Sequence, residues 1–329
     1  MALLPWLRPA AETVRSLDAQ ARLPHALLVA GGTGIGMEQL LGWFEAYALC
    51  THAGQRPCGQ CQSCVLHKAG NHPDQLRLQP EGKAMQIKVD AVRQLVLFAQ
   101  GTAQLGQRKV IVLEAAERMN TASANALLKV LEEPPSGTLI LLQAEDASGM
   151  LPTIRSRVQK LAFKPPAAEE ALAWLEGQGV PSDDAGLLLS LHRYEPCAAL
   201  TAFNEGYLAA RRPWLDALRH QVRSPSVSTG ALDSLVSTDS EVLLRAWLSW
   251  VGDIIRVVQT GSVQWVVNLD YRDDMTELAQ QFPDARTWVR LYDALQDVMQ
   301  SAQGDNNLNW QLLLESFWLR IPAIVKRNG

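Results

Sequence analysis

Several features are missing from the sequence, and each absence excludes a class of protein. No run of eighteen apolar residues occurs, so we expect no membrane span. The first twenty residues lack the basic start, the continuous apolar stretch and the small-residue cleavage site of a secretory signal. A basic excess is also missing, since the net charge is −4, which argues against a broad face that coats nucleic acid. We therefore expect a cytoplasmic protein.

Repeats and low-complexity tracts are absent as well, and the remaining composition is that of an ordinary globular protein. Hydrophobic residues make up 47% of the 329 residues and charged residues 19%. A chain of this length is too long for a single ordinary core, so two or three domains are expected.

The first half of the chain alternates strand-like and helical patterns. Such alternation predicts an α/β domain in which helices flank a parallel sheet. The expected strands are residues 25–31, 74–79, 109–117, 138–144 and 158–163. Helices are expected at residues 8–22, after the loop that follows the first strand, at 89–100 with Asp90 as its N-cap, and at 121–133.

Strand signals nearly vanish after Lys164-Pro165-Pro166, which is a rigid break in the chain. We expect a first domain at 1–164, a small helical lid at 165–207 and an all-helical domain at 208–329. Residues 224–230 read as a flexible connection. An apolar stripe at helical spacing indicates either a core or a subunit interface, and periodicity does not distinguish the two. The stripe consists of Trp247, Trp250, Ile254 and Val258.

The first expected strand is followed by a glycine-rich loop that has the spacing of a phosphate-binding loop. Gly31, Gly34 and Gly36 lie between a strand and a helix, and such loops hold phosphate with backbone N–H groups. A working loop also needs a lysine for the outer phosphates and a hydroxyl for magnesium. Here Met37 and Glu38 stand at those two positions. A carboxylate about 4 Å from a phosphate would add roughly 4 kcal/mol of repulsion.

The third expected strand shows a second departure. In ATPases of this type, an aspartate at the strand end orients magnesium and the next glutamate polarises the attacking water. Glu114 and Ala115 occupy these positions, and alanine cannot act as a base. An ordinary strand-to-helix turn is the alternative for the loop alone. The paired defects favour a nucleotide site that has lost its function, so we expect no bound ATP and no intrinsic ATPase activity.

Four of the five cysteines lie within fifteen residues. Cys50, Cys58, Cys61 and Cys64 supply four thiolates, enough for a closed tetrahedral site, so we expect a structural zinc in a knuckle at 50–64. An iron–sulfur cluster is the competitor, but its spacing would place a fourth cysteine at position 68, which is Lys68. The nearby histidines, at 67 and 72, are expected to be ordinary hydrogen-bonding residues.

Taken together, these motifs resemble a known family. The glycine loop, the cysteine knuckle, His72-Pro73-Asp74, ANALLKVLEEPP at 124–135 and IRSR at 154–157 are similar to the delta-prime subunits of bacterial DNA polymerase III clamp loaders. The specific similarity covers about residues 20–165. The resemblance implies an AAA+ fold with a helical lid and a helical collar domain that assembles with other subunits.

The resemblance also implies a role for one arginine. The family's Ser-Arg-Cys motif corresponds to Ser156, Arg157 and Val158, and its arginine acts in trans on ATP bound by a neighbouring subunit. Taken alone, the Ser-Arg dipeptide favours a solvated charge or a local salt bridge over this role. The implied partners are the ATPase motor subunits and the clamp-opening delta subunit, with primed DNA and the sliding clamp reached through the complex. No membrane partner is expected.

Two other functions remain open. The chain could be a catalytically competent AAA+ motor subunit of the same assembly, against which Met37, Glu38 and Ala115 count. It could instead be a zinc-dependent DNA-binding module. That reading has little support, because Arg56 and Lys68 are the only fixed positive charges in the knuckle stretch.

Overall fold

The computed structural model describes residues 3–82, 85–106, 108–161, 163–224, 232, 235, 239–303 and 309–326. The chain forms two compact units, Met1–Ala167 and Ala168–Gly329. In the part of the chain that the structure describes, no helix combines the length and the apolar character needed to cross a membrane.

The first unit is built on a five-stranded sheet in the order β2-β3-β4-β1-β5, and all its pairings are parallel. The strands are β1 (Ala26–Ala30), β2 (Gln75–Leu78), β3 (Lys109–Leu113), β4 (Thr138–Ala144) and β5 (Gln159–Lys160). Because β1, β3 and β4 are buried on both faces, their sequences are continuous apolar runs. The expected parallel sheet is therefore confirmed, although β5 is only two residues long.

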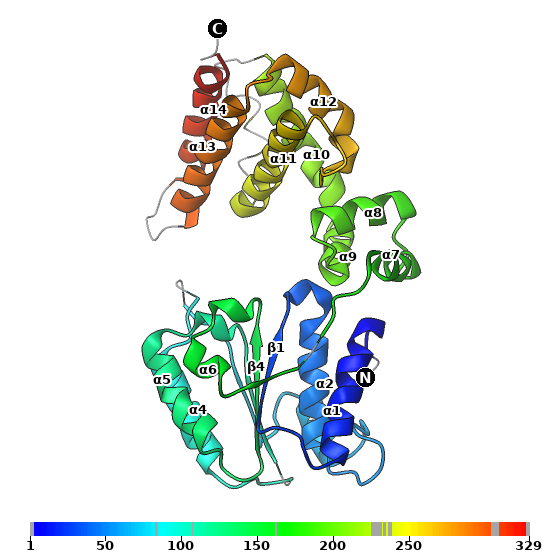
Figure 1. Ribbon diagram of the computed structural model, residues 1–329, viewed down its shortest axis with the longest axis vertical. Coiled ribbons are helices and arrows are strands. Elements are labelled where there is room, and N and C mark those ends of the chain that lie inside the picture. Colours follow the sequence, from blue (N-terminus) through cyan, green and yellow to red (C-terminus); the bar gives the residue numbers. More distant parts are fainter. Residues whose placement is uncertain are drawn as a thin grey trace. The chain divides into compact units, whose positions relative to one another are not determined.

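Helices cover both faces of the sheet. They are α1 (Arg8–Ala19), α2 (Met37–Leu49), α3 (Gln62–Lys68), α4 (Val89–Gln100), α5 (Thr121–Glu132) and α6 (Pro152–Arg155). In Figure 1, α1 and α2 lie on one side of the sheet and α4 and α5 on the other. Alternate residues of β1, β3 and β4, such as Leu28, Ile111 and Ile140, pack in one core with Leu95 and Leu127 of α4 and α5.

The second unit is helical and contains two hydrophobic clusters. The first involves α7 (Ala168–Gly177), α8 (Ser182–Leu191) and α9 (Pro196–Asn204). The second involves α10 (Tyr207–Arg223), α11 (Ser240–Thr260), α12 (Arg272–Gln281), α13 (Ala285–Gln303) and α14 (Trp310–Lys326). The helical character of this half agrees with the AAA+ layout that the family resemblance implies. The division into a lid at 165–207 and a collar at 208–329 stays a prediction.

The structure shows where the apolar stripe of α11 lies and corrects the expected N-cap of α4. Trp247, Trp250 and Ile254 are fully buried in the larger cluster, so this part of the stripe is core. The N-cap of α4 is Lys88 rather than Asp90, which lies in the first turn and pairs with Arg93 at 3.0 Å. The connection expected at 224–230 falls, apart from Ser224, outside the described residues.

Candidate functional site

The glycine loop lies at the carboxyl end of β1 and leads directly into α2. A short 3-10 turn, Thr33–Ile35, is followed by Gly36 with a φ of +85°, a conformation that favours glycine. The indole Nε1 of Trp6 donates a hydrogen bond of 2.8 Å to the carbonyl of Ile35. The loop is thus held in shape by the chain's own N-terminal segment.

Gly31, the first glycine of the spacing, has a packing role. A Cβ added there would lie 2.9 Å from Cδ1 of Ile35 and 3.0 Å from Cε of Met37. Met37 is itself buried, with 1% of its surface exposed. The residue at the lysine position is therefore a core side chain. Gly36 is favoured by the backbone conformation of the loop, independently of any phosphate.

Glu38, at the hydroxyl position, belongs to an ion cluster centred on Arg77 of β2. Arg77 binds Glu45 of α2 through both Nε (2.9 Å) and Nη2 (2.6 Å). Its remaining nitrogen, Nη1, lies 2.5 Å from Oε1 of Glu38 and 3.3 Å from Oε1 of Glu114. One guanidinium therefore contacts both acidic residues that the sequence motifs place at the expected magnesium positions.

Burial sets the electrostatics of this cluster. The side chain of Glu45 is 0% exposed, so its charge depends on the bidentate pairing with Arg77. Although burial disfavours a charge on Arg77, the hydrogen bonds to Glu45 outweigh it and raise the pKa of the guanidinium. Burial also raises the pKa of Glu114, and Arg77 offsets only part of that rise. Three carboxylates share one cation, so the cluster has an excess of negative charge.

The carboxyl end of β3 is joined to the glycine loop by Gln143 of β4. The amide oxygen of Gln143 accepts from the backbone N–H of Ala115 at 2.8 Å, and its nitrogen donates to the carbonyl of Gly31 at 3.3 Å. Ala115 itself has a φ of +46°, unusual for a residue with a side chain. Sequence reasoning found Glu114 and Ala115 but missed Arg77 and Gln143, although a polar residue near the end of an apolar strand was a usable signal.

The four knuckle cysteines come together where the end of α2 meets the start of α3. Their Sγ atoms all lie within 4.8 Å of one another. The Sγ atoms of Cys50 and Cys61, and those of Cys58 and Cys64, are each 3.9 Å apart. The backbone N–H of Cys61 donates to Sγ of Cys58 at 3.3 Å. The cluster can hold a metal ion.

The thiol pKa values fit a site that needs a cation. Burial disfavours the Cys61 thiolate, yet backbone hydrogen bonds from Cys64 and Thr51 outweigh it and lower the pKa of Cys61 to about 6. Burial raises the pKa of Cys64 to about 12. Bare thiols in this cluster therefore do not all ionise at neutral pH, whereas a divalent ion would favour the four thiolates together.

Residues next to the knuckle have partners within the chain. Nδ1 of His67 lies 2.8 Å from Oε1 of Gln75, and Nδ1 of His72 accepts from the backbone N–H of Asp74. Neither histidine belongs to the cysteine cluster. Arg56 pairs with Asp18 of α1 at 2.5 Å and lies over the ring of Tyr47. These contacts of Arg56 anchor the knuckle to α1 and α2.

Arg157 follows α6 and contacts the end of α5. Its Nε and Nη2 lie 2.8 and 2.6 Å from Oε1 of Glu132, and its Nη1 donates to the carbonyl of Thr153 at 3.0 Å. The side chains of Arg157 and Glu132 are 36% and 49% exposed. An exposed pair of this kind contributes little stability, so Arg157 can exchange partners at small cost.

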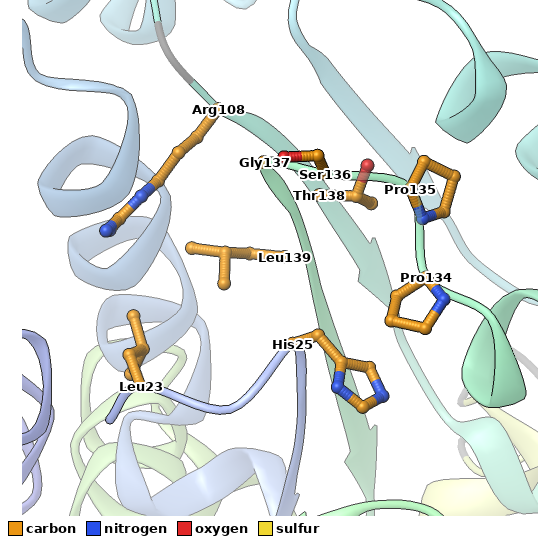
Figure 2. A pocket seen from close by; sticks show the side chains of 9 residues that line it. All are labelled: Leu23, His25, Arg108, Pro134, Pro135, Ser136, Gly137, Thr138 and Leu139. Carbon is orange, nitrogen blue, oxygen red and sulfur yellow. The ribbon is translucent and has the colours of Figure 1, made fainter. Parts of the chain in front are cut away.

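A pocket of 280 Å³ lies at the opposite end of the sheet from the glycine loop, near the starts of β1, β3 and β4. Figure 2 shows His25, Arg108 and the two prolines of the LEEPP segment among its lining residues. The imidazole of His25 contacts the carbonyl of Leu131 at 3.0 Å, and Arg108 pairs with Asp18 at 2.7 Å. Both basic groups thus have partners inside the protein.

Comparisons with known proteins agree with these features. The family model described as DNA polymerase III, delta subunit matches residues 8–167, and the model for its C terminal part matches residues 191–322. The DNA polymerase III subunit delta' of Pseudomonas aeruginosa is 34% identical over 314 residues, which is 93% of this chain and 95% of that protein.

Other relatives extend the comparison. The subunit delta' of Escherichia coli is 33% identical over 324 residues, covering 96% of this chain and 94% of its relative. The subunit tau/gamma of Haemophilus influenzae is 33% identical over 144 residues, which is 44% of this chain and 20% of that protein. The glycine loop, the cysteine knuckle and the IRSR segment all lie within the residues that the first family model matches, and the chain belongs to the family of DNA polymerase III delta' subunits.

Proposed function

We propose that this chain is a subunit of the clamp loader that hydrolyses no ATP itself and completes the ATP site of a neighbouring subunit with Arg157. The observation that supports the first part most strongly is Met37. Its side chain stands at the lysine position and is buried in the core, so it offers no charge to a phosphate. Ala115, at the base position, has no group that can activate water.

The role of Arg157 is supported by its surroundings. The guanidinium lies at the surface, and its carboxylate partner is half exposed, so exchange of Glu132 for a phosphate would lose little. A guanidinium delivered from an adjacent subunit stabilises the charge that develops during phosphoryl transfer. Val158 stands where the family has cysteine, but that residue is not the charged group.

For the knuckle we propose a structural zinc held by Cys50, Cys58, Cys61 and Cys64. In a tetrahedral Zn–S₄ site with bonds of about 2.3 Å, neighbouring sulfur atoms are roughly 3.8 Å apart. The Sγ–Sγ distances of the pairs Cys50–Cys61 and Cys58–Cys64, both 3.9 Å, are close to this value. Bound zinc would stabilise the thiolate forms and fix the knuckle. Four cysteines fill the coordination shell, so the site has a structural role rather than a catalytic one.

The alternatives fit the residues less well. A motor subunit would need a lysine and a catalytic carboxylate where Met37 and Ala115 stand. A DNA-binding knuckle would need free positive charge, yet Arg56 is paired with Asp18. We therefore assign the contact with primed DNA and the sliding clamp to the assembled complex, which includes the ATPase and delta subunits and acts in the cytoplasm.

The test is reconstitution with and without this chain. The isolated chain should show no ATP turnover, and a mixture of the ATPase and delta subunits should gain DNA-stimulated turnover when the chain is added. Sustained hydrolysis by the chain alone would favour the motor alternative. Salt-resistant DNA binding by the chain alone at physiological ionic strength would favour the DNA-binding alternative.

A further inference from the structure

The three nitrogens of the Arg77 guanidinium, at the centre of the ion cluster, bind different partners. Nε and Nη2 of Arg77 form the fork that binds the buried Glu45. That fork alone satisfies the charge of Glu45, and Gln75 adds a hydrogen bond of 3.0 Å to the same carboxylate. Nη1 is then left for two other partners, Glu38 and Glu114. The stabilisation of Glu45 does not require these two contacts.

The two partners of Nη1 come from the two positions at which a nucleotide site holds magnesium. Glu38 stands where the hydroxyl ligand belongs, at the start of α2. Glu114 stands where the magnesium-orienting aspartate belongs, at the end of β3. A single nitrogen within 2.5 and 3.3 Å of their Oε1 atoms lies between them, as a bound cation would.

We propose that Arg77 is the built-in cation of this site and the residue that determines that the loop accepts no divalent metal. The guanidinium neutralises part of the charge of Glu38 and Glu114 and lies between their carboxylates. A magnesium ion requires oxygen ligands in near-octahedral geometry at about 2.1 Å, and it cannot share that space with an arginine anchored to β2.

This inference extends the proposed function, since it explains why the chain takes no magnesium nucleotide. It is nevertheless independent of Arg157. The two acidic residues at the magnesium positions do not themselves exclude metal, because carboxylates are good magnesium ligands. Without Arg77 they would form a site that attracts a divalent ion, so the exclusion depends on the arginine.

The experiment measures Mn²⁺ binding by the full-length chain with its knuckle metal in place, using electron paramagnetic resonance. The double variant Arg77→Gln with Glu45→Gln removes the guanidinium without leaving a buried charge unpaired. We expect it to bind one Mn²⁺ at least tenfold more tightly than the wild-type chain, a difference of about 1.4 kcal/mol. Adding Glu38→Gln should abolish the gain. Arg93→Gln, at an exposed ion pair on α4, is the matched control and should change nothing.

A second variant guards against loss of folding. Arg77→Lys keeps a positive charge beside Glu45, but an ammonium group lacks the fork that spans three carboxylates. It should also gain Mn²⁺ affinity, but less than the double variant because its ammonium group still offsets part of the acidic charge. The gain is judged on protein whose circular dichroism matches the wild type. Folded variants with no gain, or wild-type binding of Mn²⁺ that depends on Glu38, would overturn the role of Arg77. ATP hydrolysis by the isolated wild-type chain would instead overturn the proposed function.

Discussion

Two arginines of the first unit pair with glutamates in different ways. Arg77 contacts three carboxylates, and one of them, Glu45, is fully buried. Arg157 contacts one carboxylate, that of Glu132, whose side chain is half exposed. The two arginine side chains differ little in exposure, at 29% and 36%. The two arginines therefore differ in the number of their carboxylate partners and in the burial of those partners, whereas their own exposure is similar.

The difference indicates which arginine is available to another molecule. Releasing Arg77 would leave a buried charge without compensation, whereas releasing Arg157 would leave two groups that water can solvate. Arg77 therefore serves the fold of its own chain, and Arg157 can serve a neighbour. In our proposal, a nucleotide site that has lost its function and an arginine that acts on a neighbour coexist in one chain, because the arginine of the first is held by a buried carboxylate and that of the second is not.

The contrast between Arg77 and Arg157 depends on a folded first unit. Of the changes considered, removal of the knuckle metal should lower the stability of that unit most. Binding of zinc to four-cysteine sites contributes on the order of 10 kcal/mol or more to local folding. Chelation should release one equivalent of zinc and abolish hydrogen-exchange protection at residues 50–68, while α5 keeps its protection. Mass spectrometry of the exchanged protein measures both regions. Release of iron in metal analysis would reject zinc.

The next largest effect should come from Arg77→Gln with Glu45 retained. The free energy of unfolding should fall by about 3 kcal/mol, the lower end for breaking a buried ion pair, because Arg77 is partly exposed. Urea denaturation measures this loss. Restoring neutrality with Glu45→Gln should recover part of it. A loss below about 0.5 kcal/mol would show that Arg77 is as dispensable to the fold as Arg157.

Asp18 gives the reverse arrangement, in which one buried carboxylate binds two arginines, Arg56 and Arg108. Burial opposes its charge, but hydrogen bonds from Arg108 and Tyr47 outweigh it and lower the pKa of Asp18 below 3.8. Because the pKa of Asp18 is lower in the folded chain than in the unfolded chain, the ionised carboxylate stabilises the fold at pH values above the unfolded-state pKa. This stabilisation is lost as the pH falls through the folded-state pKa.

Asp18→Asn should therefore cost about 2 kcal/mol at pH 7, and the difference from the wild type should shrink as pH falls from 5 to 3. Urea denaturation across this range measures the difference. A constant difference at all pH values would mean that the charge of Asp18 contributes nothing and that only its hydrogen bonds count.

The smallest effect should follow Glu132→Gln. The exposed pair with Arg157 contributes at most about 0.5 kcal/mol, so the unfolding midpoint should hardly move. Arg157→Gln should be equally mild. A loss of 2 kcal/mol or more in either variant would make Arg157 a structural residue and remove the contrast with Arg77.

The sequence was informative where local pattern determines structure. Continuous apolar runs predicted the parallel strands, since a strand buried on both faces leaves no polar alternation. The cysteine spacing predicted the cluster, because residues so close along the chain need little tertiary information to meet. The tryptophan stripe was ambiguous for a physical reason: helical periodicity is the same for a core and for an interface.

The parts that escaped prediction depend on long-range contacts. Arg77 meets Glu114 because β2 lies beside β3 in the sheet, and it meets Glu38 because α2 packs on β3. Nothing local in the sequence specifies either neighbour. Gln143 joins the ends of β1 and β3 for the same reason. The motif His72-Pro73-Asp74 found its explanation only in the structure, where the carboxylate of Asp74 accepts N–H groups from residues 104–106.

The most direct test of the central claim is single-turnover ATP hydrolysis by the reconstituted complex containing Arg157→Ala. The complex should assemble normally, and hydrolysis at the one site that borders this chain should slow by about a thousandfold, the usual cost of losing a trans-acting arginine. Arg155→Ala, an exposed arginine two residues earlier, should leave the rate unchanged. An unaltered rate in the Arg157→Ala complex would contradict the account.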